Sequence, residues 1–356
     1  MLDWSGTSGG PALDRARRLV RERGGAAQLV VVHGGRVVAD VAHGCAADDL
    51  FWVFSTSKPF TALLVHRLAE RGALALDDPL ARHWPAFGAH GKEAITVRHV
   101  LQHRSGLPVA RGSVADALTM ADWNGSVRAL ERARPRFPAG GGPAYQYLTY
   151  GFLLGELLRR ITGTPIRELM TEEILAPLGL RDTYLGVPDA ALARQVPLRA
   201  RGPAGRATQV FVNRRETRQA VIPAAGISTT ARDLAVLYQA LLDGGAPLLT
   251  PQSLAAATMP TSDGTVDAFI KLPIRWSQGF QLGGPGLDPD RPRPMGRTSS
   301  PQAFGHNGSN VCVAWADPAR RLVVACLTNR VESRTAGAAA HNAVAEAILA
   351  EFPTHG

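Results

Sequence analysis

Lysine is scarce in this chain, although positive charge is not. Of 39 basic residues only three are lysines, and the other 36 are arginines. An arginine keeps its proton in a protein, whereas a lysine can lose its proton when it is desolvated or lies near other positive charge. Each of the three lysines is therefore a candidate for a chemical role: Lys58, Lys92 and Lys271.

Cysteine and long apolar runs are also in short supply. The cysteines are odd in number and have apolar neighbours, which is typical of small core residues and not of a disulfide framework: Cys45, Cys312 and Cys326. No stretch approaches the roughly 18 apolar residues of a membrane helix. The first residues show no basic segment followed by the apolar stretch of a secretory signal. We therefore expect a cytoplasmic protein with no membrane partner.

The formal net charge of +9 raises the question of nucleic-acid binding. The arginines are scattered through many segments, and their tightest groups, within 15–23 and 214–218, have no aromatic residues between them. Neither a zinc-finger spacing nor an RNA-binding signature accompanies these groups. We therefore expect no nucleic-acid partner.

Apolar periodicity predicts strands at both ends of the chain and helices between them. Gly34 and Gly35 separate two β-rich runs as in a tight hairpin, since both can adopt a positive φ. We expect an α/β plus all-α fold, with an antiparallel sheet from residues 1–73 and 274–356 and a mainly helical domain inserted over 74–273. Helices at the two termini should pack on the sheet. The predicted strands are 28–33, 36–42, 50–54, 275–282, 311–316 and 322–328, and the terminal helices are 13–23 and 334–352.

The sequence Ser55-Thr56-Ser57-Lys58 is an S-x-x-K motif between a predicted strand and an amphipathic helix. Residues three apart lie on one face of a helix, so the lysine amine comes within reach of the serine hydroxyl. A serine becomes a good nucleophile when a neighbouring base removes its proton. The start of a helix also supplies free N–H groups where an oxyanion would form. The motif therefore predicts nucleophilic catalysis by Ser55, with helix capping as its alternative role.

Two further segments accompany the S-x-x-K motif and form a set of three motifs with it. Residues 143–151 read PAYQYLTYG, and residues 304–309 read FGHNGS ahead of a predicted strand. Together with the S-x-x-K motif, in this order, they make the chain resemble the serine β-lactamase and penicillin-binding-protein superfamily. The resemblance is to its class C-like branch of esterases and acyltransferases, and it covers roughly residues 20 to 350.

The resemblance implies roles for the motif residues. Ser55 would be the nucleophile, and Lys58 its proton-relay partner. Tyr145 would be the general base that later protonates the leaving group. The backbone N–H groups of Ser55 and Ser309 would form the oxyanion hole. No metal or cofactor is implied.

The tyrosine motif departs from the family pattern Tyr-x-Asn, because here it reads Tyr145-Gln146-Tyr147. Alignment on Gly151 favours Tyr145 as the base, and Tyr147 stays the alternative, with a second possible role in contacting substrate. The absent Asn is the amide expected to bind the acylamido group of a β-lactam.

The third motif departs as well, since His306-Asn307-Gly308 stands where many relatives have Lys-Thr-Gly. A histidine is largely neutral near pH 7, so the site lacks a fixed cation for a β-lactam carboxylate. We expect His306 to act in catalysis, and Asn307 and Gly308 to contact substrate.

These features predict a serine acyl-enzyme hydrolase or acyltransferase for a small ester or amide, with water, an amine or an alcohol as acceptor. A β-lactamase or D,D-peptidase is the first alternative, and a catalytically inactive binding homologue is the second.

His99 and His103 have the four-residue spacing of a zinc pair. Val100 stands where the H-E-x-x-H motif needs Glu, so we expect no metal site there.

Overall fold

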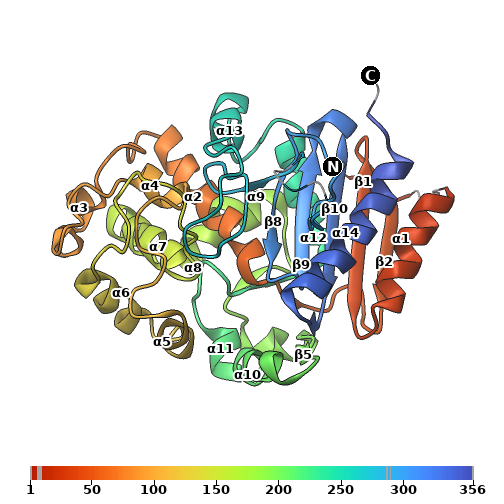
Figure 1. Ribbon diagram of the computed structural model, residues 1–356, viewed down its shortest axis with the longest axis horizontal. Helices are drawn as coiled ribbons and strands as arrows, with labels where there is room; N and C mark the ends of the chain where they lie inside the picture. The colour runs from red at the N-terminus through yellow and green to blue at the C-terminus, as the bar shows by residue number, and fades with distance from the viewer. Residues whose placement is uncertain (1, 6–9, 286–287, 289, 355–356) are drawn as a thin grey trace.

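The computed structural model describes residues 2–5, 10–285, 288 and 290–354. Between the strands near the two ends of the chain, the structure is mainly helical, with long and short helices and a few brief strands (Figure 1). No helix in the described residues combines the length and the apolar character needed to cross a membrane. The helices are α1 (Pro11–Glu22), α2 (Lys58–Glu70), α3 (Leu80–His83), α4 (Val97–Leu101), α5 (Ser113–Leu118), α6 (Trp123–Arg132), α7 (Thr149–Thr162), α8 (Ile166–Met170), α9 (Ala176–Leu178), α10 (Pro203–Val212), α11 (Arg215–Gln219), α12 (Ala231–Leu242), α13 (Pro251–Thr258) and α14 (Arg334–Glu351).

The main sheet has six antiparallel strands in the order β2-β1-β10-β9-β8-β7, drawn from both ends of the chain. Gly34 and Gly35, both at positive φ, join β1 to β2 as predicted. The predicted antiparallel sheet with terminal helices is confirmed. Two of its predicted strands were wrong in part: residues 51–52 pair with residues 228–229 in a separate small sheet, and only residues 281–282 of the predicted strand 275–282 form a strand. The strands are β1 (Ala27–His33), β2 (Arg36–His43), β3 (Phe51–Trp52), β4 (Tyr184–Leu185), β5 (Arg199–Ala200), β6 (Ile227–Thr229), β7 (Gln281–Leu282), β8 (Phe304–Gly308), β9 (Cys312–Asp317), β10 (Leu322–Thr328) and β11 (Arg330–Val331).

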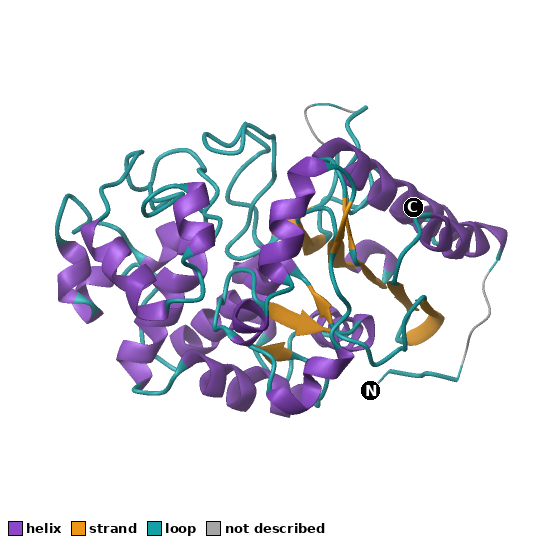
Figure 2. Ribbon diagram, turned by 90° about the horizontal axis from the view of Figure 1, so that it is seen from below, coloured by secondary structure: helices purple, strands orange, loops and turns teal. Residues whose placement is uncertain are grey.

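Helices cover both faces of this sheet because its central strands are apolar on both sides. Alternate residues of β1 point to opposite faces: Leu29 and Val31 belong to the core under α1 and α14, whereas Val30 and Val32 belong to the core that includes α12. Figure 2 shows the strands with helices on either side. The two terminal helices pack against each other and close one face.

The core that includes α12 continues without a break into the helical part of the chain around α2 and α7. Figure 1 shows this part beside the sheet, with α2 between them. A small sheet, β3-β6-β4, lies where the two parts meet. The division at residues 73 and 274 stays a prediction, although α12, within 74–273, packs on β1, β9 and β10.

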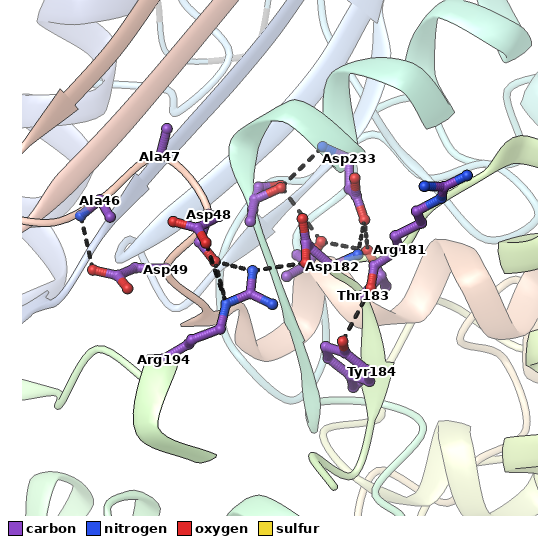
Figure 3. A network of polar contacts seen from close by, with 12 residues as sticks. Ala46, Ala47, Asp48, Asp49, Arg181, Asp182, Thr183, Tyr184, Arg194 and Asp233 are labelled. Atoms are coloured by element: carbon purple, nitrogen blue, oxygen red, sulfur yellow. Dashed lines mark hydrogen bonds and ion pairs between the residues drawn. The ribbon is translucent and has the colours of Figure 1, made fainter. Parts of the chain in front are cut away.

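A polar network ties the start of α12 to the loops around it (Figure 3). The Asp233 carboxylate accepts hydrogen bonds from Thr183 Oγ1 at 2.8 Å and from Asp182 N at 2.9 Å. Arg194 joins Asp182 at 2.7 Å and donates to the carbonyl of Asp48 at 3.0 Å. Burial raises the pKa of Asp233 to about 6, despite these hydrogen bonds.

Asp233→Asn should flatten the pH dependence of stability below neutrality. The folded protein binds this proton more tightly than the unfolded chain, so stability should fall as pH rises from about 4 to about 6. An amide oxygen can accept the same two hydrogen bonds without titrating. Urea unfolding at about pH 4 and about pH 7 should show a fall smaller by about 1–3 kcal/mol in the variant. Asp243→Asn, an exposed carboxylate at the other end of α12, is the control; an equal fall in all three proteins would contradict this assignment.

Candidate active site

Ser55 lies in a short turn and not in the helix itself. β3 ends at Trp52, Phe54 adopts a positive φ of 48°, and a 3₁₀ turn over Phe54–Ser57 leads into α2. A positive φ at a bulky residue is uncommon, and such strain is often found at functional sites. The prediction of a strand through residue 54 and a helix from Ser55 was therefore wrong at these boundaries. The turn still places residues 55 and 58 on one side of the chain, since residues three apart eclipse in a 3₁₀ helix.

The amine of Lys58 is fully buried and has three close partners. Its Nζ lies 3.1 Å from Ser55 Oγ, 2.8 Å from the carbonyl of Tyr147 and 3.2 Å from the carbonyl of Ala224. Burial lowers the pKa of Lys58 well below its usual range. A neutral amine has two N–H donors for the two carbonyls and one lone pair for the serine hydroxyl. The contacts therefore suit a lysine that can accept the Ser55 proton.

Tyr145 is the tyrosine whose hydroxyl reaches the serine. Its hydroxyl lies 2.7 Å from Ser55 Oγ, and burial raises the pKa of this phenol, so it stays protonated and donates. Tyr147 has a different position: its carbonyl accepts from Lys58, while the residue as a whole is 36% exposed and lines the cleft. The structure thus brings together Ser55, Lys58 and Tyr145, but not the Tyr147 hydroxyl.

Strand β8 brings the third motif to the same place. Thr56 Oγ1 donates to the carbonyl of His306 at 3.2 Å, which joins the serine turn to the strand. A Cβ on Gly308 would come within 2.1 Å of the Val53 carbonyl, so only glycine allows this approach. Ser309 follows at a φ of 52° and lines the cleft with Ser55. The two backbone N–H groups expected to form an oxyanion hole therefore come from facing segments.

His306 is buried and lies under the site. Its Nδ1 lies 2.9 Å from the carbonyl of Asn307, while its Nε2 has no partner among the described residues. Burial, and then the charge of Lys58, lower the pKa of His306 to about 3. The ring is therefore neutral, as expected from the sequence. The side chain of Asn307 pairs with Asn310 and also lines the cleft.

Three buried side chains to which the sequence patterns assigned no such role hold Tyr145 in place. The Asp267 carboxylate accepts from the Tyr145 backbone N–H at 2.8 Å. The Trp276 ring stacks on Tyr145, with centroids 5.3 Å apart and planes 11° apart, and the His103 ring lies 4.7 Å away. Asp267 and Trp276 are more than a hundred positions from Tyr145 in sequence, so no local pattern could have revealed them.

His103 has a packing role instead of the metal role considered for the pair with His99. His99 Nδ1 accepts from the Thr96 backbone N–H at the start of α4, whereas His103 lies among the aromatic rings of the site. No group of three potential metal ligands occurs among the described residues. Of the other lysines, Lys92 donates to three backbone carbonyls and Lys271 is exposed, so Lys58 is the one within the site.

A cleft of about 440 Å³ opens over Ser55. Tyr145 and Tyr147 border it, as do Asn307 and Ser309. The arrangement provides a serine hydroxyl with a basic amine on one side and a phenolic proton donor on the other. Such a site can form a covalent bond between Ser55 and a carbonyl carbon.

Comparison with known proteins agrees with this chemistry. A family model described as Beta-lactamase matches residues 16–348. The Mycobacterium tuberculosis protein Esterase/beta-lactamase LipL is 31% identical over 353 residues, which cover 87% of this chain and 78% of that protein.

Solved structures match over nearly the whole chain. A penicillin-binding-protein homologue from Caulobacter crescentus has a TM-score of 0.80 and 29% identity, over 96% of this chain and 98% of the other. EstA from Arthrobacter nitroguajacolicus Rue61a has a TM-score of 0.79 and 26% identity, over 98% of both chains.

Proposed function

Because the chain belongs to the β-lactamase family, we propose that it is a serine hydrolase that cleaves small esters through acylation of Ser55. One observation carries the proposal: Ser55 Oγ contacts both the buried amine of Lys58 and the phenol of Tyr145. The directions of the two pKa shifts indicate which group accepts a proton and which group donates one. Lys58, with a lowered pKa, accepts the serine proton, and Tyr145, with a raised pKa, donates one. This assignment differs from the resemblance, which implies Tyr145 as the general base and Lys58 as its relay partner.

The reaction follows from this assignment. As Ser55 Oγ bonds to the substrate carbonyl carbon, its proton passes to Lys58, and the carbonyl oxygen becomes an oxyanion near the backbone N–H groups of Ser55 and Ser309. When the bond to the alcohol oxygen breaks, Tyr145 protonates that oxygen, and the proton held by Lys58 restores the phenol. Water then attacks the acyl-enzyme by the same steps and releases the acid.

The immediate surroundings favour esters over β-lactams. His306 is neutral, so it offers no fixed cation to the carboxylate of a β-lactam. Gln146, in the middle of the tyrosine motif, is fully buried, and Tyr147 occupies the cleft where the family pattern has an Asn. A name that couples esterase with β-lactamase in a relative at 31% identity supports β-lactam hydrolysis as the second candidate function.

We expect kcat/KM for p-nitrophenyl acetate or butyrate to exceed that for a penicillin or a cephalosporin. The loss of a charged contact and of an amide hydrogen bond should each weaken β-lactam binding by about 1–3 kcal/mol. Steady-state rates on the purified protein measure this ratio, and intact-protein mass spectrometry with an active-serine probe reports whether Ser55 is acylated at all. A β-lactam with a higher kcat/KM than every simple ester would reverse the order of the two candidates. Absence of both labelling and turnover would leave the inactive binding homologue.

The molecule that accepts the acyl group from Ser55 is the other part of the proposal. Water gives an esterase, and an amine or alcohol gives an acyltransferase on the same acyl-enzyme. Product analysis with a millimolar amine in the assay separates the two: faster transfer than hydrolysis would favour the acyltransferase.

Tyr145→Phe should damage turnover far more than Tyr147→Phe. Both changes keep the ring and remove only a hydroxyl, but only the Tyr145 hydroxyl contacts Ser55, while the Tyr147 contact with Lys58 is made by its backbone. We expect a loss in kcat of about 10²–10⁴ for Tyr145→Phe, the usual contribution of a proton-transfer group. Each variant serves as the other's control, and the reverse ranking would transfer the role to Tyr147.

A further inference from the structure

Arginines gather at one end of the active-site cleft. Arg275, Arg291 and Arg293 line it together with Ser55. Arg275 and Arg293 donate to the carbonyls of the successive residues Gly283 and Gly284, so their side chains converge on one short segment. Burial lowers the pKa of Arg293; the charge of Asp288 opposes this, and the nearby charges of Arg275 and Arg291 add to it.

Little negative charge compensates this cluster. Glu332 is the one carboxylate among the described residues that line the cleft, and it lies 3.6 Å from Arg23 and 4.0 Å from Arg201. The exposed Asp288 adds one negative charge that acts on Arg293, and its backbone carbonyl accepts from Arg293 at 3.4 Å, so one carboxylate faces three guanidinium groups. The cluster therefore keeps an excess of positive charge.

Of these three arginines, Arg291 makes the fewest polar contacts with the rest of the protein. It has no hydrogen bond or ion pair to another residue in the part of the chain that the structure describes, although it lines the cleft. Arg275 uses one terminal nitrogen on backbone carbonyls, Arg293 uses both of its terminal nitrogens, and each keeps further N–H groups. A guanidinium presents N–H groups in the planar fork that carboxylates and phosphates accept.

An apolar wall connects this cluster to the catalytic end. The ring of Phe269 contacts Tyr147, and the chain then runs through Ile270, Leu272 and Ile274, all lining the cleft, to Arg275. Because position 275 is five residue steps after position 270, the two are at most about 18 Å apart. A flexible apolar chain of medium length can lie along such a wall.

We infer that the natural ester carries an anionic group, a carboxylate or a phosphate, at the end of an apolar chain, and that Arg291, Arg293 and Arg275 bind this group. The inference rests on the proposed function, because it names the substrate class of the same site. The cluster acts on binding and takes no part in the bond changes at Ser55.

Matched esters test the inference. Rates are measured on p-nitrophenyl esters of one chain length that end in a methyl group, a carboxylate or a phosphate. We expect an anionic ester to have a kcat/KM about tenfold above that of the neutral ester, the size of one charge-assisted hydrogen bond. The better of the two anions identifies the group. Equal values for all three esters would overturn the inference while leaving the proposed esterase intact.

Two variants and a control separate local recognition from general attraction to a protein of net charge +9. Arg291→Gln should abolish most of the preference, and Arg291→Lys should retain part of it. Arg128→Gln removes the same charge from the exposed side of α6 and should keep the whole preference. An equal loss in Arg291→Gln and Arg128→Gln would overturn the assignment.

A binding measurement needs no turnover and keeps the inference separate from the proposed function. Titration calorimetry on Ser55→Ala should show monomethyl octanedioate binding about tenfold more tightly than methyl octanoate. This difference should shrink in the double variant with Arg291→Gln. Equal affinity for the two esters would contradict the inference whether or not esters are cleaved.

Discussion

Ser55→Ala is expected to lower kcat/KM for p-nitrophenyl esters by a factor on the order of 10⁴ or more, the scale seen when a covalent nucleophile is removed. The Ser55 hydroxyl contacts both the amine of Lys58 and the phenol of Tyr145. Without it, neither proton transfer has a partner. The remaining rate should reflect only binding and polarisation by the cleft.

The fold should survive this change. Lys58 keeps its two carbonyl partners in Ser55→Ala, so the buried amine retains acceptors for its N–H groups. Thermal unfolding by circular dichroism provides the check, and Ser113→Ala on the exposed surface of α5 is the control. Retention of more than about a tenth of the activity would exclude Ser55 as the nucleophile.

Lys58→Arg should be nearly as damaging as Lys58→Met, although arginine keeps the positive charge. A guanidinium cannot release its proton at working pH, so it cannot accept the proton of Ser55. Methionine removes the amine while filling a similar volume. We expect both variants to lose about 10²–10⁴ in kcat, the range for a general base.

The pH dependence distinguishes a base from a fixed charge. The pKa of Lys58 is lowered, so the active neutral form should populate as pH rises, and kcat/KM of the unaltered enzyme should rise with it. Lys58→Arg should lack this rise in its residual activity. Near-normal activity in Lys58→Arg would mean that the residue acts as a fixed charge. Because a permanent charge in this buried position is costly, thermal unfolding of both variants is measured alongside the rates.

Much of this protein could be predicted from local patterns alone. Two-residue periodicity and the Gly34-Gly35 turn predicted the β1–β2 hairpin, and strand patterns at both ends predicted the shared sheet. The order of three short motifs predicted the family, which the match over residues 16–348 confirms. These features depend on residues close together in sequence, where the physics of turns and strand faces acts directly. The 3₁₀ turn at Ser55 was missed because its strain is stored by surrounding tertiary contacts.

Tertiary structure decided how the motif residues contact one another and what surrounds them. Alignment on Gly151 favoured Tyr145 but left Tyr147 open, and the packing of Tyr145 against Trp276 and its contact with Asp267 place the Tyr145 hydroxyl against Ser55. The lowered pKa of Lys58 likewise follows from burial. The arginine-lined end of the cleft is assembled from segments that carry no motif. Desolvation and contacts between distant segments create these properties, so a single sequence contains them only through the fold that it adopts.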